Sequence, residues 1–220
     1  MAQRRNTRTE AAIRTAFITL LKQKGLNAMT VSDIARLANI NRGTFYTHYM
    51  DKFDLCQQLI DNAHADLTDI IRTSSARYGA SPTNSRIELI QYETILQCLV
   101  YIKQDYAFFD AISRSGNDMV LYSKCKELIA ELLTVEFEQQ AGGPANTATV
   151  FSVYGREMIA SATTSVLWLW MRRGCVEPPE TIARFIDTAC HLPPVDVMNA
   201  RLVERSAMAR QSGASGPQGR

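Results

Sequence analysis

The residues of this sequence that could act as nucleophiles or bind a metal include five cysteines and three histidines. The cysteines contain no CxxC pair, and no His and Cys grouping has the ligand spacing of a zinc site. Glu136 and Glu138 stand two apart on a predicted helix and therefore on different faces. No glycine-rich phosphate loop and no GxSxG or HExxH motif occurs. These patterns argue against an enzyme, and we expect no catalytic residue, no metal and no cofactor.

The charged residues are divided unevenly along the chain, although the formal net charge of the 220 residues is only +2. Residues 1–55 contain nine Lys and Arg against four Asp and Glu, a surplus of five. The remaining residues contain fifteen against eighteen, a deficit of three. Such asymmetry indicates that the basic part binds a polyanion. The 46% hydrophobic composition is that of a globular chain and excludes global disorder.

Helices must position the residues of the basic segment, and their start signals are local. The pattern Thr7-Arg-Thr-Glu10 predicts a first helix, which should end at Gly25. Apolar residues then repeat at helical spacing at Ile13, Ala16, Phe17, Leu20 and Leu21. The pattern Thr30-Val-Ser-Asp33 predicts the start of a second helix in the same way.

Only Asn39-Ile-Asn41 separates the second helix from a third, expected at Arg42–Tyr49. Asn39 suits the left-handed conformation that ends a helix, and Asn41 suits a helix cap. Asp51 is expected to cap a fourth helix. Two short helices joined by a tight turn form a helix-turn-helix, whose second helix can enter the major groove of DNA.

Residues 30–52, TVSDIARLANINRGTFYTHYMDK, resemble the signature of the tetracycline-repressor (TetR) family of transcriptional regulators. The similarity lies in Ala35, in the run Gly43-Thr44-Phe45-Tyr46, in His48-Tyr49 and in Lys52. It is specific over residues 8–60 and extends over the rest only in the helical layout. Asn39 stands where the family usually has glycine, and asparagine tolerates the same left-handed conformation.

Carried over by position, the resemblance implies a set of DNA contacts around the third helix. Arg42 is expected to pair with guanine, and Gly43 to let the backbone approach the bases. The other expected contacts are Ser32, Thr44, Tyr46, Thr47, His48 and Lys52. Tyr46 has the alternative role of a partly buried residue. The arm residues Arg4, Arg5 and Arg8 either bind phosphates or a minor groove, or form a solvated terminus.

No segment of residues 52–191 shows convincing strand alternation, so we expect an all-α protein of about nine helices. The later helices are predicted at residues 52–73, 85–103, 105–113, 117–140, 147–173 and 179–191. We therefore expect a DNA-binding domain at residues 1–55, whose arm is residues 1–8. A helical effector-binding and dimerisation domain should follow at residues 56–192, and a largely disordered tail at residues 193–220.

The segment from Thr147 to Met171 is apolar or small on nearly every side, so a helix there must be buried on more than one face. In the resembled family, the last two helices pair with their copies in a homodimer, which places two recognition helices on palindromic half-sites. The residues expected at this interface are Trp168, Trp170, Ile182, Phe185, Ile186 and Ala189. One or both tryptophans have the alternative role of core residues.

The resemblance also implies an effector pocket among the helices of the second domain. The candidates are soft or polar-tipped residues: His64, Tyr92, Cys98, Tyr101, Phe108, Tyr122, Phe151, Tyr154 and Met158. Each has the alternative role of a core residue. The effector is expected to be a small molecule or a protein. A protein effector is included because residues 92–174 faintly resemble a TetR subgroup with members that act with a protein partner.

Taken together, the sequence predicts a cytoplasmic, sequence-specific transcriptional regulator that binds a palindromic DNA operator as a homodimer. We expect a repressor that an effector releases. The alternative is an activator or coactivator-dependent regulator controlled by a protein partner. No membrane partner is expected, because the longest apolar run, Val166–Met171, has six residues and the N-terminus does not fit a signal peptide.

Overall fold

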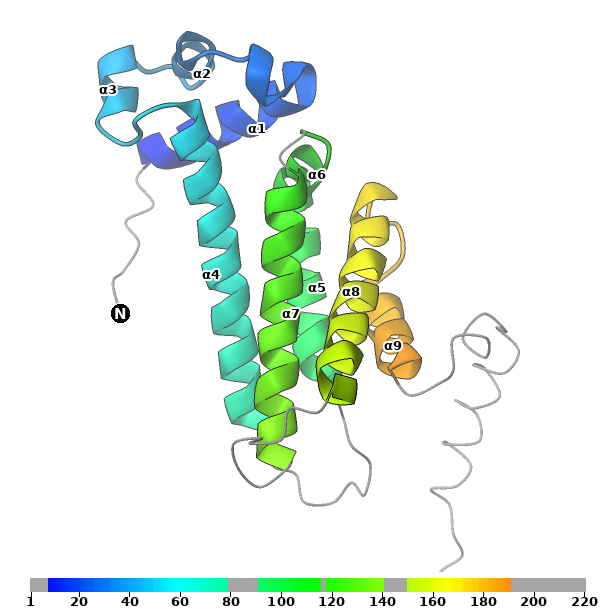
Figure 1. The fold of residues 1–220 in the computed structure, drawn as a ribbon. Helices are drawn as coiled ribbons and strands as arrows, with labels where there is room; N and C mark the ends of the chain where they lie inside the picture. The colour runs from blue at the N-terminus through cyan, green and yellow to red at the C-terminus, as the bar shows by residue number, and fades with distance from the viewer. Residues whose placement is uncertain (1–7, 79–90, 116–117, 141–149, 191–220) are drawn as a thin grey trace, which may run out of the picture.

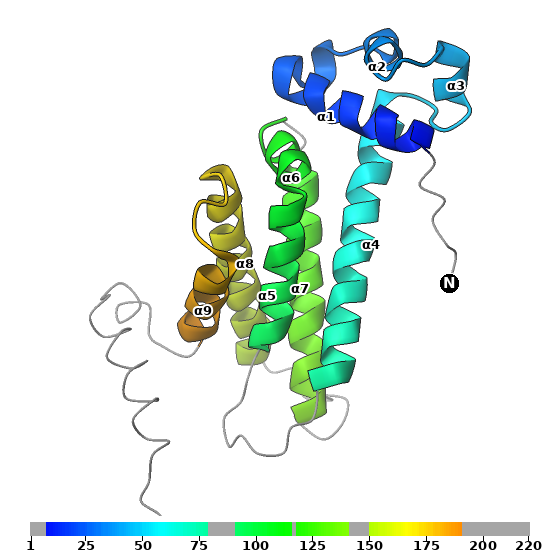
Figure 2. The same cartoon turned by 180° about the vertical axis from the view of Figure 1, so that it is seen from behind.

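The computed structural model describes residues 8–78, 91–115, 118–140 and 150–190, and in these ranges every regular element is a helix (Figures 1 and 2). The helices are α1 (Arg8–Ala28), α2 (Val31–Leu37), α3 (Arg42–Tyr46), α4 (Lys52–Tyr78), α5 (Tyr92–Gln104), α6 (Tyr106–Ser113), α7 (Asp118–Gln140), α8 (Val150–Arg172) and α9 (Pro179–Ala189). The predicted all-α class is confirmed. We call α1–α3 with the start of α4 the head, and the rest the body.

The head forms around the apolar face of α1. All five apolar residues that the periodicity selected, from Ile13 to Leu21, are buried, together with Phe45 of α3. Gly25 has φ 75° and ψ 169°, so the regular helix breaks there as predicted, and a short helical continuation reaches Ala28. The predicted capping residue Thr7 and the arm residues Arg4 and Arg5 lie outside the described residues.

The body is a bundle in which α4 runs from the head along the other helices (Figures 1 and 2). Helix α7 packs against α4 and α8, while α5 packs against α4 and α9. The predicted helices of the body are confirmed within the described residues, where their ends differ from the prediction by up to five residues. The predicted residues 85–90, 117, 147–149 and 191 lie outside the described residues. Helix α4 extends past the predicted end at residue 73, because Ser74 is buried and tertiary packing overrides its weak helix preference. The predicted boundary between residues 55 and 56 falls inside α4, and the predicted tail lies outside the described residues.

Two basic residues of the head face the body and connect the two parts. Arg14 of α1 pairs with Asp105, and its guanidinium lies 5.1 Å from the ring centroid of Phe108. Lys22 lies 3.3 Å from a carboxylate oxygen of Asp110. These contacts attach α1 to the segment at the end of α5 and to α6. Part of the basic surplus of residues 1–55 therefore serves the contact with the body.

Within the described ranges, the structure has no helix that is both long enough and apolar enough to cross a membrane.

Candidate DNA-binding surface

Helix α2 begins with a complete capping box. The Thr30 hydroxyl oxygen accepts a hydrogen bond from the backbone N–H of Asp33 at 3.1 Å, and the Asp33 carboxylate accepts one from the Thr30 N–H at 3.0 Å. Lys24 donates to the same carboxylate at 2.6 Å. The hydrogen bonds from Lys24 and Thr30 hold the pKa of Asp33 well below its usual range. The start of α2 is thereby fixed to the end of α1.

The turn between α2 and α3 has the predicted geometry. Asn39 adopts a left-handed conformation with φ 55°, and the side chain of Asn41 accepts from the Thr44 N–H at 2.8 Å. The caps predicted at Asn41 and Asp51 are both present, since Asp51 accepts from the N–H of Phe53 and that of Asp54 at 2.8 Å. Helix α3 ends at Tyr46, three residues before the prediction.

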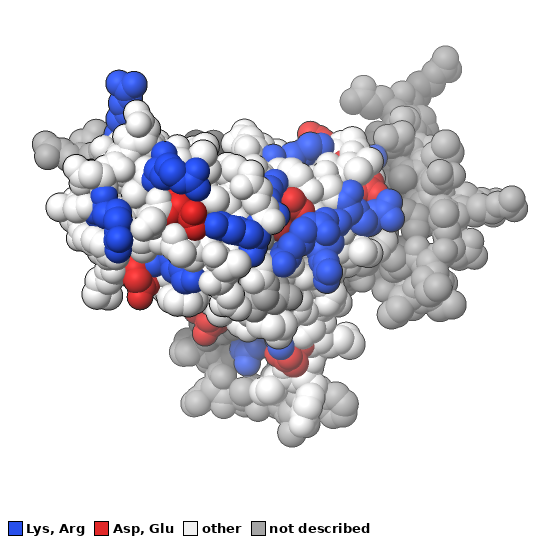
Figure 3. Space-filling model, turned by 90° about the horizontal axis from the view of Figure 1, so that it is seen from above, with Lys and Arg blue, Asp and Glu red and all other residues white. Residues whose placement is uncertain are grey.

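Most of the expected contacts are displayed on the outer surface of the head. Arg42, Gly43 and Thr47 are exposed, as is Ser32 of α2, and Tyr46 is 50% exposed. Viewed onto the end of the molecule that carries the head, basic side chains outnumber acidic ones among the described residues (Figure 3). This surface combines a guanidinium, hydroxyl groups and positive charge, which is what contact with base edges and phosphates requires.

Gly43 and Thr44 also take part in the cap that begins α3. A Cβ atom added at Gly43 would lie 3.2 Å from Oδ1 of Asn41, which is the capping atom. The Thr44 hydroxyl donates to the same oxygen at 3.0 Å, and its own carbonyl accepts from the Thr47 hydroxyl at 2.7 Å. Any side chain at residue 43 would therefore press on the cap.

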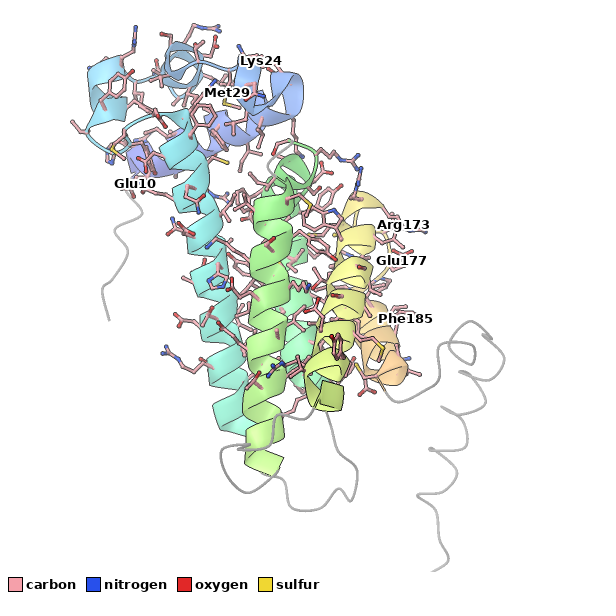
Figure 4. All side chains as sticks on the ribbon, in the orientation of Figure 1. Glu10, Lys24, Met29, Arg173, Glu177 and Phe185 are labelled. Carbon is pink, nitrogen blue, oxygen red and sulfur yellow. The ribbon has the colours of Figure 1, made fainter. Side chains whose placement is uncertain are left out.

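Two expected phosphate contacts have their polar atoms on partners within the head. The Lys52 ammonium donates to the carbonyl oxygens of Asn27 and Met29, both at 2.8 Å. The Nδ1 atom of His48 lies 3.3 Å from Oε1 of Glu10, a residue of α1. Figure 4 places Glu10 and Met29 at two different parts of the head, so Lys52 and His48 secure separate regions of it.

The structure adds one candidate that motif comparison did not select. Arg36 of α2 has a side chain that is 78% exposed, and its guanidinium lies 3.3 Å from the Asp33 carboxylate. It stands four residues after Ser32, on the same side of α2. This spacing from Ser32 is the feature of the sequence by which Arg36 could have been identified. Arg8, at the start of α1, is also exposed.

The residues predicted to line an effector pocket have different environments in the part of the chain that the structure describes. Phe108 lies in the core, Tyr154 is 71% exposed and Met158 is 68% exposed. His64 of α4, Tyr92 and Cys98 of α5 and Tyr122 of α7 are half-buried, and the side chain of Phe151 is outside the described residues. Tyr101 lines a cavity of about 640 Å³, which lies between α1, α4 and α5 instead of deep in the body.

The predicted interface residues separate into core and surface. Trp170 is 2% exposed, and its indole N–H donates to the carbonyl of Glu177 at 3.1 Å, while Ile186 is also buried. Both belong to the core of this chain. For Trp170 this is the alternative role predicted from the sequence for one or both tryptophans. Trp168, Ile182 and Ala189 are half-buried, and Phe185 is exposed on α9, below Glu177 in the view of Figure 4.

A different set of residues forms an exposed stripe along α8, and we call it the α8 stripe. Its members recur at intervals of three or four residues, on one side of the helix: Tyr154, Met158, Ala162, Ser165 and Leu169. Leu169 is 62% exposed. Large apolar side chains at both ends and small residues between them could accommodate a second helix.

Comparisons with known proteins agree with this architecture. Residues 13–59 match the family described as bacterial regulatory proteins, tetR family. Residues 91–191 match the one described as transcriptional regulator C-terminal region. The chain is 40% identical over 74 residues to YxbF of Bacillus subtilis, described as an uncharacterized HTH-type transcriptional regulator; this match covers 33% of the chain and 20% of YxbF. Matches to the curated relatives cover from 20% to 51% of their lengths.

Solved structures share the fold at low sequence identity. The fatty acid degradation regulator FadR from Bacillus halodurans superposes with a TM-score of 0.61 at 17% identity, over 86% of this chain and 96% of that one. The dihydroxyacetone kinase operon activator DhaS superposes with a TM-score of 0.54 at 18% identity, over 83% and 93%.

Proposed function

This chain belongs to the TetR family of transcriptional regulators, and from that premise we propose that it binds a palindromic operator as a homodimer and represses transcription until an effector releases it. It is a DNA-binding regulator and not an enzyme. The chromosome is its proposed partner, so we also propose that it acts in the cytoplasm.

The observation that carries this proposal is the exposed surface of α3. Arg42 projects from a helix whose first turn is fixed by Asn41, so that its guanidinium can be presented to guanine O6 and N7. The exposed Gly43 lets the α3 backbone approach the base edges, while Thr47, Tyr46 and Ser32 supply hydroxyl groups for phosphates.

The homodimer is supported by the α8 stripe. Tyr154, Met158 and Leu169 leave large apolar surfaces exposed on one side of one helix, an arrangement typical of an interaction surface. Phe185 of α9 is exposed as well. Two-fold pairing through α8 and α9 would present two α3 helices to DNA, at half-sites separated by about 34 Å or a multiple of it.

Release by an effector is supported by the connections between head and body. Helix α4 belongs to both, and the Arg14–Asp105 and Lys22–Asp110 pairs join α1 to the body at a second position. A ligand that favours a different position of the body relative to α1 would alter the separation of two paired heads and weaken operator binding.

Repression is the sign of regulation that we propose, and activation with a protein partner is the alternative. DhaS, which shares the fold, is described as an operon activator, so the fold is compatible with activation. A reporter gene behind the bound promoter distinguishes them. Repression predicts higher expression when the gene for this protein is deleted, and activation predicts lower expression.

The test of the proposed function is a genomic footprint of the purified full-length chain. The proposal predicts protection of discrete sites that share an inverted repeat. Gel shifts at increasing salt should retain a preference for these sites over random DNA. Equal affinity for all sequences, with a steep dependence on salt, would contradict it, because such binding depends on phosphate contacts alone.

A further inference from the structure

The cavity of about 640 Å³ lies at the junction between head and body, away from the exposed surface of α3. Its wall is formed by Glu10 and Arg14 of α1, Asp66 of α4, and Tyr101 and Asp105 at the end of α5. Its volume is within the range of small-molecule sites, roughly 300 to 1,000 Å³. A molecule in this cavity would touch the helix that begins the head and two helices of the body at once.

The polar groups of the wall carry an excess of negative charge. The wall includes three carboxylates, those of Glu10, Asp66 and Asp105, and one guanidinium, that of Arg14. Arg14 pairs with Asp105, and Oε1 of Glu10 lies 3.3 Å from Nδ1 of His48. Asp66 accepts a hydrogen bond from the Tyr101 hydroxyl at 2.9 Å, a neutral donor that leaves its charge in place. Carboxylates in a concave site concentrate negative potential, which attracts a cation and repels an anion.

The remaining wall gives such a cation apolar and aromatic surroundings. Leu59 and Ala63 are buried and present aliphatic surface, and the rings of Tyr49 and Tyr101 are half-buried in the wall. Burial, and the carboxylates near each ring, raise the pKa of both tyrosines, so they stay neutral and their ring faces remain attractive to a positive charge. The amide of Asn62 adds a further polar group to the wall.

We propose that this junction cavity binds an organic cation, a small molecule with a primary amine or guanidinium group, and that this ligand is the effector. The inference rests on the proposed function, since it names the ligand class of that regulation. The cation would pair with Asp66 and Glu10 while its carbon chain lies against Leu59 and the tyrosine rings. Because the cavity wall includes α1 as well as α4 and α5, ligand binding and operator binding would change each other's affinity by the same factor.

Isothermal titration of the DNA-free, full-length chain tests the ligand class. The probes are 1,4-diaminobutane and agmatine, compared with the neutral 1,4-butanediol and the dianion glutarate. We expect saturable binding of one cation per chain and no binding of the diol or of glutarate. Binding of glutarate, or no binding of either cation, would overturn the proposal.

Two substitutions on α4 separate the cavity from general electrostatics. Asp66→Asn removes a charge from the wall and keeps an oxygen that can accept from Tyr101. Asp69→Asn removes the same charge one turn away, where the side chain is 69% exposed and pairs with Arg72. The cavity predicts at least a tenfold loss of amine affinity for Asp66→Asn and no change for Asp69→Asn. Equal losses would show surface attraction and refute the site.

Operator binding by the wild-type chain without any amine separates the two proposals. A chain that binds its operator but none of the cations retains the proposed function and loses this inference. A chain that binds no specific operator loses the proposed function, whatever the titration shows.

Discussion

Replacing Lys52 by methionine tests whether its ammonium group holds the head together or contacts DNA. The ammonium donates to the carbonyls of Asn27 and Met29, both at 2.8 Å. A hydrogen bond to a charged group contributes about 1.5–3 kcal/mol. Met29 is fully buried, while Asn27 is exposed, so water can replace the lost donor at Asn27 more readily than at Met29. We therefore expect Lys52→Met to lower the free energy of unfolding by about 2–3 kcal/mol.

The assay combines urea unfolding with operator affinity at several salt concentrations. Each phosphate contact contributes about 0.9 to the slope of log affinity against log salt. If Lys52 is an internal support, the variant binds its operator more weakly and keeps the wild-type slope. Lys22→Met is the charge-matched control, because it removes the same charge from a side chain that faces Asp110 of the body.

The opposite pattern would refute this reasoning. A Lys52→Met variant that is as stable as the wild type but has a slope lower by about 0.9 per head would place the ammonium on a phosphate.

Four further substitutions address the DNA surface, the helix caps and the dimer. Arg42→Ala should weaken operator binding by about 1–3 kcal/mol and relax the preference at one base pair of each half-site; a gel-shift series with unchanged affinity and selectivity would contradict this. Asn41→Ala should lower the free energy of unfolding by about 1 kcal/mol, measured by urea unfolding, and an unchanged midpoint would exclude the cap as a stabilising contact. Met158→Asp should convert a dimer to a monomer in light scattering, whereas Met119→Asp, at an exposed methionine of α7, should not; equal masses for the two would place the interface elsewhere. The lowered pKa of Asp33 contributes stability that is complete above the ordinary pKa of an aspartate, about 3.9, and is lost as the pH falls toward the folded-state pKa. Asp33→Asn should therefore flatten the acid limb of a curve of unfolding free energy against pH. An acid limb that is the same as in the wild type would contradict this role of Asp33.

The helix starts of the head could be predicted because their signals are local. Thr30 and Asp33 stand only three residues apart, and Asn41 reaches Thr44 across the same interval. Asn39 needs only its own backbone freedom to adopt a positive φ. None of these features depends on a distant part of the chain, so residue type and spacing were sufficient.

Side-chain directions in the head depended on distant partners and could not be predicted in this way. Lys52 meets carbonyls 25 and 23 residues earlier in the chain, and Arg14 meets Asp105, 91 residues later. A motif position specifies that a lysine stands at the start of α4. It does not specify whether its ammonium group points toward DNA or toward the end of α1.

The burial of α8 posed a related problem, since this helix is apolar or small on almost every side. Periodicity alone gave no reason to place Trp170 in the core and Leu169 on the surface, although they are neighbours in sequence. That choice is made by the contacts of α8 with α6 and α7, together with the hydrogen bond from Trp170 to the loop before α9. For the same reason, the predicted pocket residues were divided among core, surface and junction.

The mass of the complex on a selected operator tests the central claim most directly. Randomised duplexes are enriched by the purified chain, and native mass spectrometry then measures the protein bound to the selected sequence. We predict an inverted repeat that carries two chains, and loss of the two-chain complex when one half-site is scrambled. A single chain on a site without internal symmetry would contradict the account.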